Sequence, residues 1–282
     1  MESVSAVPEV QTAAPVNKVL RFDVHQRLQH LVMMTTFIIL VATGMPLKFS
    51  GWGMSQWWID FWGGIETTRT VHRIAGWTML GDCLYHILYI GYGTLLRKRP
   101  FPYWMVPTPR DFRDFFQELR YFTGLAKTRP QYDRFNWREK FDYMAIFWGI
   151  PIIGISGLIM MYPVFWTKFL PGWIVPAALV AHGDEALLAL LWIVIVHLVF
   201  NHLAPGVFPI NTSIFSGKVP RERYRHEHSL EYERKFGSDI ALEATPADPP
   251  PQGAAGEPLD APETPPETPE VKGEENPEGR TR

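Results

Sequence analysis

Four apolar stretches, each long enough to cross a lipid bilayer, constrain this chain more than any other feature of its sequence. They cover residues 28–47, 71–93, 141–162 and 181–203. A membrane-spanning helix needs about 20 predominantly apolar residues, and a backbone in lipid must satisfy its own hydrogen bonds. The sequence therefore predicts an all-α, integral membrane protein whose four-helix bundle runs up-down-up-down.

The positive charges between these stretches predict the orientation of the bundle, because cytoplasmic loops carry an excess of lysine and arginine. The loop between the second and third stretches is strongly basic, and so are the N-terminal arm and the segment after the fourth stretch. The two other loops are rich in tryptophan and carry only Lys48, Arg69 and Lys168. Both termini are therefore expected to be cytoplasmic, in a multi-pass protein of the cell inner (cytoplasmic) membrane. The first residues, about 25 in number, lack the apolar core of a signal peptide, so no cleavable signal is expected.

The regions outside the bundle differ in composition. Residues 110–122 place large apolar side chains on one helical face, which predicts an amphipathic helix on the inner membrane surface; an ordinary soluble loop helix is the alternative. These side chains are Phe112, Phe115, Phe116, Leu119 and Phe122. From residue 244 the chain is rich in proline and glutamate, which predicts a disordered C-terminal tail. The expected organisation is an N-terminal cytoplasmic arm (1–24), the four-helix membrane domain (25–219), a charged cytoplasmic segment (220–243) and the tail (244–282).

Composition excludes some functions and leaves histidine as the unusual residue. The net charge of −2 argues against a nucleic-acid partner. The single cysteine, Cys83, excludes an intramolecular disulfide and a cysteine-held iron–sulfur or zinc site. Nine histidines are present, and six of them lie in or beside the apolar stretches. Histidine inside a membrane is costly and marks a functional site by default.

The spacing of these histidines places them at two levels of the membrane. His72 and His86, on the second stretch, are separated by about 21 Å along a helix. His182 and His197, on the fourth stretch, are separated by about 22 Å. The two helices run in the same direction, so His72 and His182 share the outer level, while His86 and His197 share the inner one. His30, at the start of the first stretch, also lies at the inner level.

Two levels about 20 Å apart fit two b-type haems, one near each membrane face. Two neutral imidazoles saturate a haem iron, which then shuttles single electrons instead of binding oxygen. The alternative is that histidines serve packing or interhelical hydrogen bonds, and it remains open above all for His86 and His202. The wide separation of the levels disfavours one compact copper or zinc site. His25, His226 and His228 lie in polar segments and are expected to be ordinary surface residues.

Four motifs follow one another along the chain. They are RLQH followed by TG, then VHRIAG, then FNWREKFDYMAIFWG, and finally AHGDEALLA followed by IVIVH. In this order and spacing they resemble the cytochrome b subunits of membrane-bound formate dehydrogenases, thiosulfate reductases and nickel–iron hydrogenases, over residues 21–219. The resemblance implies that residues 25–219 form a cytochrome b domain.

The resemblance also implies haem ligands. His72 and His182 match the ligands of an outer haem, and His30 and His197 match those of an inner haem. His86 has no counterpart in the formate dehydrogenase subunit, but two histidines on each of two helices is also the pattern of bc-type cytochromes b. His86 therefore remains a rival to His30 as the partner of His197. The interval from His182 to His197 is one residue longer than in that subunit, which suggests a bulge or a slight rotation.

Other residues are assigned by the same resemblance or by their position. Asn136 matches a quinone-site position of the family, so quinone is expected as an exchangeable substrate near the inner haem. Arg69 and Arg73 flank His72 and are candidates to pair with the propionates of the outer haem, as Arg27 is at the inner level. Anchoring at the membrane interface is the alternative for these three arginines.

These expectations combine into a di-haem membrane subunit of a respiratory oxidoreductase. It would carry electrons between an extracytoplasmic iron–sulfur or multihaem c-type subunit and the quinone pool. The chain alone carries no group able to cleave a substrate, so an electron-transfer subunit is expected in place of a complete enzyme. A transmembrane electron conduit to extracytoplasmic acceptors and a haem-free membrane anchor are the alternatives.

Overall fold

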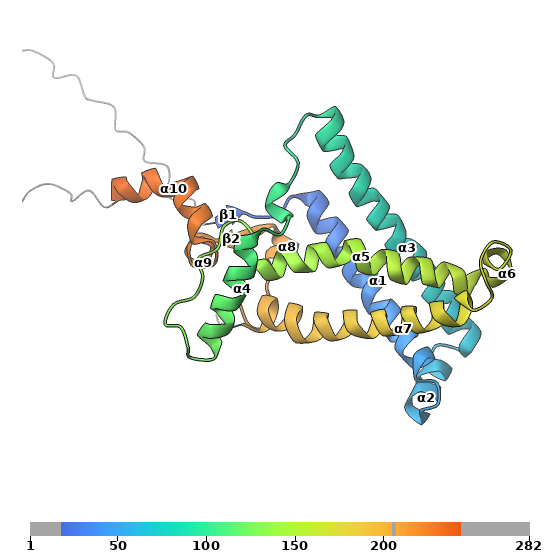
Figure 1. Cartoon of the computed structure of the whole chain (residues 1–282). Helices are drawn as coiled ribbons and strands as arrows, with labels where there is room; N and C mark the ends of the chain where they lie inside the picture. The colour runs from blue at the N-terminus through green and yellow to red at the C-terminus, as the bar shows by residue number, and fades with distance from the viewer. Residues whose placement is uncertain (1–17, 205–206, 244–282) are drawn as a thin grey trace, which may run out of the picture. The chain divides into compact units, whose positions relative to one another are not determined.

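The structure of the chain is a computed structural model that describes residues 18–204 and 207–243 (Figure 1). Its long helices are α1 (Val24–Lys48), α3 (Ile65–Gly91), α5 (Trp137–Met161) and α7 (Ile174–Trp192). Two π-helices extend them, η1 (Tyr92–Leu96) after α3 and η3 (Ile193–Leu203) after α7. The shorter elements are α2 (Gly53–Phe61), the 3-10 turn η2 (Tyr103–Met105), α4 (Pro109–Phe122), α6 (Pro163–Trp166), α8 (Ser213–Ser216), α9 (Arg221–Glu227) and α10 (Ser229–Glu243), with the strands β1 (Lys18–Leu20) and β2 (Lys218–Pro220).

Capping residues set where α1 and α5 begin. Asp23 accepts from the backbone N–H of Gln26 at 2.9 Å, and the Gln26 side chain accepts from the Asp23 N–H at 3.0 Å. Asn136 and Glu139 make the same reciprocal pair, at 3.0 and 2.8 Å. Such capping boxes satisfy backbone donors that the first turn leaves free. Both helices therefore start several residues before the apolar stretches that predicted them.

Three of the described helical segments are long and apolar enough to cross a membrane: Val24–Lys48, Trp137–Met161 and Ile174–Leu203. They confirm three of the four predicted stretches as candidate spans. The second stretch is helical over most of its length, within α3, but it is not among these candidates. Polar residues such as Asp82 and His86 lower the apolar character of α3.

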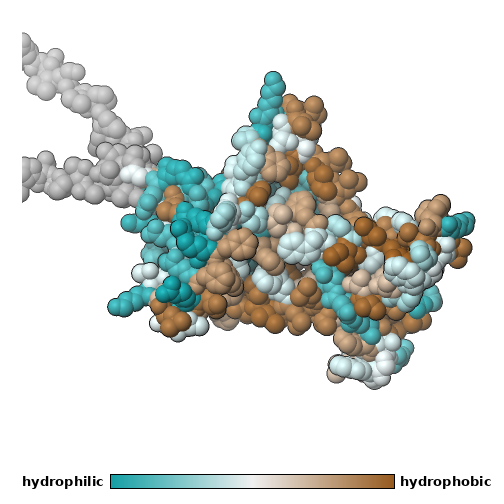
Figure 2. All heavy atoms as spheres, in the orientation of Figure 1, coloured by the Kyte–Doolittle hydropathy of each residue, from teal (hydrophilic) through white to brown (hydrophobic). Residues whose placement is uncertain are grey.

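The long helices form two pairs, α1 with α3 and α5 with α7, and the pairs meet through α1 against α7 and α3 against α5 (Figure 1). Small residues line the contacts, among them Thr43, Ala75, Ser156 and Ala178, all buried. Small side chains let helix backbones approach closely, which is how helices associate in lipid. Figure 2 shows apolar residues along the long helices and hydrophilic residues around β1, β2 and α9. A bilayer covers such exposed apolar helix surface.

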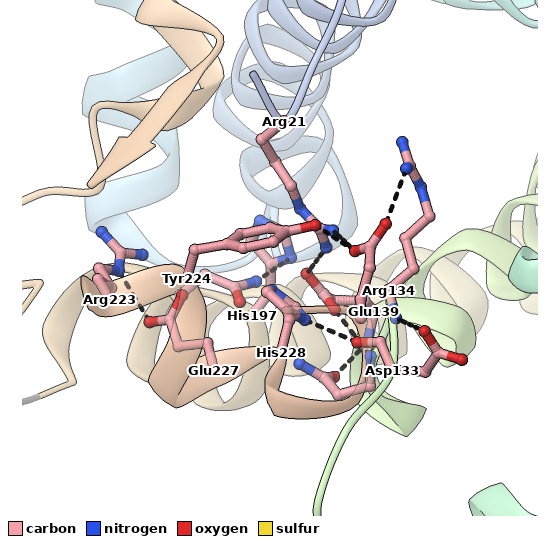
Figure 3. Close-up of polar contacts among 12 residues, drawn as sticks. Arg21, Asp133, Arg134, Glu139, His197, Arg223, Tyr224, Glu227 and His228 are labelled. Carbon is pink, nitrogen blue, oxygen red and sulfur yellow. Dashed lines mark hydrogen bonds and ion pairs between the residues drawn. The ribbon is translucent and has the colours of Figure 1, made fainter. Parts of the chain in front are cut away.

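A polar cluster, here called the polar cap, joins β1, the start of α5 and the C-terminal helices (Figure 3). The carboxylate of Glu231, 4% exposed, accepts from Arg134 at 3.1 Å and from the Tyr224 hydroxyl, and it lies 2.8 Å from Lys235. Arg21, also buried, lies 3.7 Å from the same carboxylate. Burial alone would raise the pKa of Glu231, but Lys235, Tyr224 and Arg134 together lower it to about 2. The carboxylate is therefore charged at neutral pH and binds the surrounding segments together.

His228 belongs to the polar cap, so the expectation that it is an ordinary surface residue was wrong. It is 4% exposed, and its Nδ1–H donates to the backbone carbonyl of Asp133 at 2.8 Å. The next turn is tied to the same loop, since the N–H of Leu230 donates to the carbonyl of Tyr132 at 3.2 Å. Burial lowers the pKa of His228. The polar sequence around it gave no sign that this segment folds back onto residues 132–139.

The short antiparallel pairing of β1 with β2 was not predicted either. It links the N-terminal arm to the segment that precedes α9, through strands of three residues each. Strands this short carry no usable alternation of apolar and polar residues. The compact unit that contains both strands and the long helices ends at Ser238.

The predicted amphipathic helix is present as α4, with its apolar face turned outward. Phe112 is 68% exposed and Phe116 is 59% exposed. The acidic residues of the opposite face are buried against the start of α5. Asp111 binds Lys140 at 2.8 Å, and Glu118 accepts from Trp137 Nε1 at 2.7 Å. Ionic and hydrogen-bond contacts therefore hold α4, and its aromatic face is left for another surface.

Candidate functional site

His72 of α3 and His182 of α7 face each other across the contact between the two helix pairs. Their ring centres lie 6.1 Å apart, and their planes are inclined at 63°. Each ring is oriented by the other helix of its own pair. The Nδ1 of His72 lies 2.8 Å from the Thr43 hydroxyl of α1, and the Nδ1 of His182 lies 2.9 Å from the Ile153 carbonyl of α5.

These contacts set the tautomer of both rings. The Thr43 hydroxyl donates to the carbonyl of Ile39 at 2.7 Å, so its oxygen is left to accept from the Nδ1–H of His72. The Ile153 carbonyl is an acceptor only, so the Nδ1 of His182 donates to it. With the hydrogen on Nδ1, each Nε2 keeps its lone pair. A histidine that binds a metal through Nε2 shows this arrangement.

His30 of α1 and His197 of η3 form a second pair. Their ring centres lie 6.3 Å apart, with planes 24° from parallel. The Nδ1 of His197 lies 2.8 Å from Oδ2 of Asp142, on α5, and Oδ1 of Asp142 accepts from Trp192 Nε1 at 2.5 Å. Within the residues that the structure describes, Nδ1 of His30 is buried without a hydrogen-bond partner.

Both pairs have the spacing that one iron between two imidazoles requires. A metal–imidazole bond of about 2.0 Å, with roughly 1.1 Å from that nitrogen to the ring centre, puts two opposed ring centres about 6.2 Å apart. The observed separations are 6.1 and 6.3 Å. Two histidines per site suit haem, because the porphyrin supplies the remaining iron ligands. The donor sets therefore fit two bis-histidine haems.

Two glycines leave room for the first pair. A Cβ at Gly44 would lie 3.0 Å from Cε1 of His72, and a Cβ at Gly157 would lie 3.2 Å from Cε1 of His182. Both distances are shorter than ordinary carbon–carbon contacts. Each helix pair thus carries a glycine where its histidine ring needs space.

His86 is placed differently. Its Nδ1 lies 2.7 Å from Oε1 of Gln29, which accepts, and its Nε2 lies 3.0 Å from the Tyr143 hydroxyl. Both ring nitrogens are therefore engaged by side chains of α1 and α5. Gln29 is itself buried, so His86 sits in a polar contact inside the bundle.

The segment that carries His197 is a π-helix, and the bulge suggested by the long interval after His182 is confirmed. A π-helix has wider turns than an α-helix and absorbs an inserted residue. His202 lies on the same π-helix, with its ring centre 6.2 Å from that of His197. Its Nδ1 accepts from the N–H of Asn211 at 3.3 Å, so its hydrogen is on Nε2. This tautomer is opposite to that of His72 and His182.

The other predicted residues lie around the two pairs. Asn136 caps α5 through its amide oxygen. Arg27 donates to the carbonyl of Phe215 in α8. At the opposite end, Arg69 pairs with Glu66 at 3.1 Å, and both side chains are largely exposed. Arg73 is exposed and follows His72 directly in the sequence. Within the described residues, none of the three arginines makes a hydrogen bond to a paired histidine.

Sequence reasoning missed the residues that orient the rings. Thr43 and Ser156 look like ordinary small residues of an apolar helix, and Ser156 lies 3.2 Å from Nδ1 of His182. Asp142 had a detectable signal, because it is a carboxylate near the start of an apolar stretch. That its partner is His197 could be learned only from the fold.

One comparison with known proteins shows the family of the chain. The model of the prokaryotic cytochrome b561 family, the cytochrome b subunits of nickel–iron hydrogenases and related oxidoreductases, matches residues 21–206, about two thirds of the chain. No curated protein matches the chain. The matched region contains all four paired histidines. The family supplies haem b as cofactor, and its members associate with redox partner subunits and quinone. The chain therefore belongs to the prokaryotic cytochrome b561 family, and it is a membrane b-type cytochrome of electron transfer.

Proposed function

We propose that the chain is the di-haem membrane subunit of a respiratory oxidoreductase and exchanges electrons between an extracytoplasmic redox partner and the quinone pool. His72 with His182 would hold the outer haem, and His30 with His197 the inner one. The observation that carries this proposal is the equal spacing, 6.1 and 6.3 Å between ring centres, of two pairs whose members come from different helices. His197 and His202 are also 6.2 Å apart, but both lie on η3 and His202 has the opposite tautomer.

The residues of this chain would bind the haems and orient their ligands. When bound, haem b supplies a carrier of single electrons. Thr43, Ile153 and Asp142 hold three of the rings by their Nδ1 atoms, so Nε2 is available to the iron. Both nitrogens of His86 are engaged, which favours His30 over His86 as the inner ligand. Arg27 at the inner level and Arg69 and Arg73 at the outer level would face propionates.

The proposal places four helices across the inner membrane, with α3 as the fourth. Inside a bundle that binds haem, the polar residues of α3 would face protein or cofactor instead of lipid. The basic loop before α5 and the C-terminal segment would lie on the cytoplasmic side, with α4 on the membrane surface. This orientation puts His30 and His197 near the cytoplasm, and puts α2 and α6 at the outer face. An iron–sulfur or multihaem c-type subunit would dock at that outer face.

Asn136 is the candidate quinone residue near the inner pair. Its oxygen caps α5, whereas its amide nitrogen makes no hydrogen bond within the described residues. That N–H₂ group is available to a quinone carbonyl. Reducing a quinone takes two electrons and two protons, and oxidising a quinol releases them, so the headgroup needs both the inner haem and access to cytoplasmic water.

Two variants test the role of Asn136, and they distinguish its helix-capping oxygen from its amide N–H₂ donor. Asn136→Ser keeps a good capping oxygen but removes the donor, whereas Asn136→Ala removes both. We expect both variants to keep two haems and to exchange electrons with a soluble quinone analogue more slowly, by a similar factor. Electron exchange at the wild-type rate in Asn136→Ser would contradict the assignment of Asn136. No exchange in the wild-type protein would contradict the quinone-linked function itself.

A further inference from the structure

The inner pair differs from the outer pair in the charge of the group behind its histidine. His72 and His182 are backed by neutral oxygens, a hydroxyl and a carbonyl. His197 is backed by Asp142, the one carboxylate within the described residues that makes an ion-pair contact with a paired histidine. Hydrogen bonds to an ionised acceptor are roughly twice as strong as neutral ones.

Both oxygens of Asp142 face hydrogen-bond donors. The indole N–H of Trp192 is a donor only, so Oδ1 of Asp142 must accept, at 2.5 Å. If Nε2 of His197 binds iron, Nδ1 carries the hydrogen, so Oδ2 accepts as well, at 2.8 Å. The Asn201 side-chain amide also lies 3.1 Å from Nδ1 of His197, and in this tautomer its oxygen faces that N–H. Both oxygens are acceptors in this arrangement, which is that of an ionised carboxylate.

The surroundings strengthen this contact. The side chains of His197 and Asp142 are only 20% and 18% exposed. The Trp192 indole, which donates to Asp142, also packs on Phe141, with ring centres 4.3 Å apart. This packing of α7 on α5 holds the indole N–H at the Asp142 carboxylate. Low local polarity makes a charged hydrogen bond stronger than it would be in water.

We propose that Asp142 is a positioning residue that fixes the tautomer of His197 and lowers the reduction potential of the haem held by His30 and His197. A carboxylate that accepts from Nδ1–H raises the basicity of the imidazole. A more basic ligand stabilises ferric iron over ferrous iron, so the one-electron potential falls. The outer haem, with neutral oxygens behind both ligands, lacks this effect. The inference rests on the proposed function, since it requires a haem at the inner pair.

The test is a redox titration of the haem absorption bands in the purified protein at one pH. Asp142→Asn removes the charge, but its amide N–H₂ must then face either the Trp192 N–H or the His197 N–H, so two donors meet. Trp192→Phe removes the indole N–H and keeps the carboxylate, and the double variant removes the charge without this meeting of two donors. We expect a higher potential for one of two haem components in Asp142→Asn and in the double variant. In Trp192→Phe we expect the potential of the same component to shift less than in Asp142→Asn. The potential of the second haem component should be the same in all three variants and the wild type.

Three results would overturn the inference. They are an unchanged potential in the double variant with both haems present, an equal shift of both components, or a shift in Trp192→Phe as large as in Asp142→Asn. If Asp142→Asn loses the inner haem, Asp142→Glu decides: retention of the haem with a potential near that of wild type supports the inference, and loss contradicts it. A wild-type protein without two haem components would overturn the proposed function instead.

Discussion

The imidazole rings of His30 and His197 lie with their centres 6.3 Å apart, and Nδ1 of His30 makes no hydrogen bond within the described chain. His86, the alternative ligand, instead bridges Gln29 and Tyr143. The sequence left His30 and His86 as rival ligands opposite His197, and this difference between them can be tested by mutating each one.

His30→Ala should lose one of two haems, whereas His86→Ala should keep both. The reason is that Nε2 of His86 is occupied by the Tyr143 hydroxyl, at 3.0 Å. The measurement is haem per chain in each purified variant. Loss of a haem in His86→Ala, with both retained in His30→Ala, would reverse the assignment.

The two haems should give different electron paramagnetic resonance spectra in the ferric state. The ring planes of the outer pair are inclined at 63°, and those of the inner pair at 24°. Strongly inclined imidazole planes give a low-spin signal with a large maximal g value, whereas nearly parallel planes give an ordinary rhombic signal. His72→Ala should abolish the first signal and His30→Ala the second. A single signal type in the wild-type protein would contradict the observed ring geometry.

Gly44→Ala should weaken haem binding at the outer pair by about tenfold, a typical effect of disturbing the groups around a metal ligand. The new Cβ would lie 3.0 Å from the His72 ring and would push it out of place. Gly76→Ala is the matched control on the neighbouring helix, because its Cβ would meet only Leu40, at 4.0 Å. Haem retention is measured by dialysis of the purified protein. Equal retention in the two variants would show that the His72 ring tolerates the added methyl group.

The polar cap should loosen in acid. The folded pKa of Glu231 is about 2, below its ordinary 4.5, and burial lowers that of His228 below its ordinary 6.5. In both cases the unfolded segment binds more protons as the pH falls, so their stabilisation is complete above pH 6.5. As the pH falls below 6.5, the contribution of His228 to stability is lost first. The contribution of Glu231 is lost between pH 4.5 and about pH 2. Hydrogen exchange of residues 221–236 should therefore accelerate relative to the long helices as the pH is lowered.

Glu231→Gln should destabilise the same cap at neutral pH by about 3 kcal/mol, because the buried Arg21 and the half-buried Arg134 lose their charged partner. Glu222→Gln is the control, since Glu222 is exposed on α9. Proteolysis near α9 and α10 reports the difference. Equal protection in both variants would mean that the ion pairs of Glu231 contribute little to holding these helices.

The apolar face of α4 should lie in the membrane interface. In a Cys83→Ser background, a fluorophore at Phe116→Cys should be quenched by brominated lipids more strongly than one at Gln117→Cys, which lies about 100° around the helix. Phe116 is 59% exposed, and Gln117 is half-buried. Equal quenching at the two positions would place α4 away from the bilayer.

The sequence was most informative where a pattern repeats over many residues. Hydropathy located the C-terminal ends of the long helices, with η3 counted as part of α7, to within about two residues but placed their starts four to seven residues too late. Helix spacing brought His72 level with His182. The weaker predictions concerned contacts between distant segments. The role of Asp142 depends on α5 packing beside α7, and the burial of His228 depends on the chain returning to residues 132–139. Neither contact produces a repeating pattern of apolar and polar residues in the sequence.

Haem content is the most direct measurement of the central claim. The purified chain should show the α-band of haem b in a reduced-minus-oxidised spectrum, with two haems per chain by extraction. His72→Ala and His30→Ala should each contain one. Absence of the band, or a single haem per wild-type chain, would contradict the assignment of two histidine pairs to two haems.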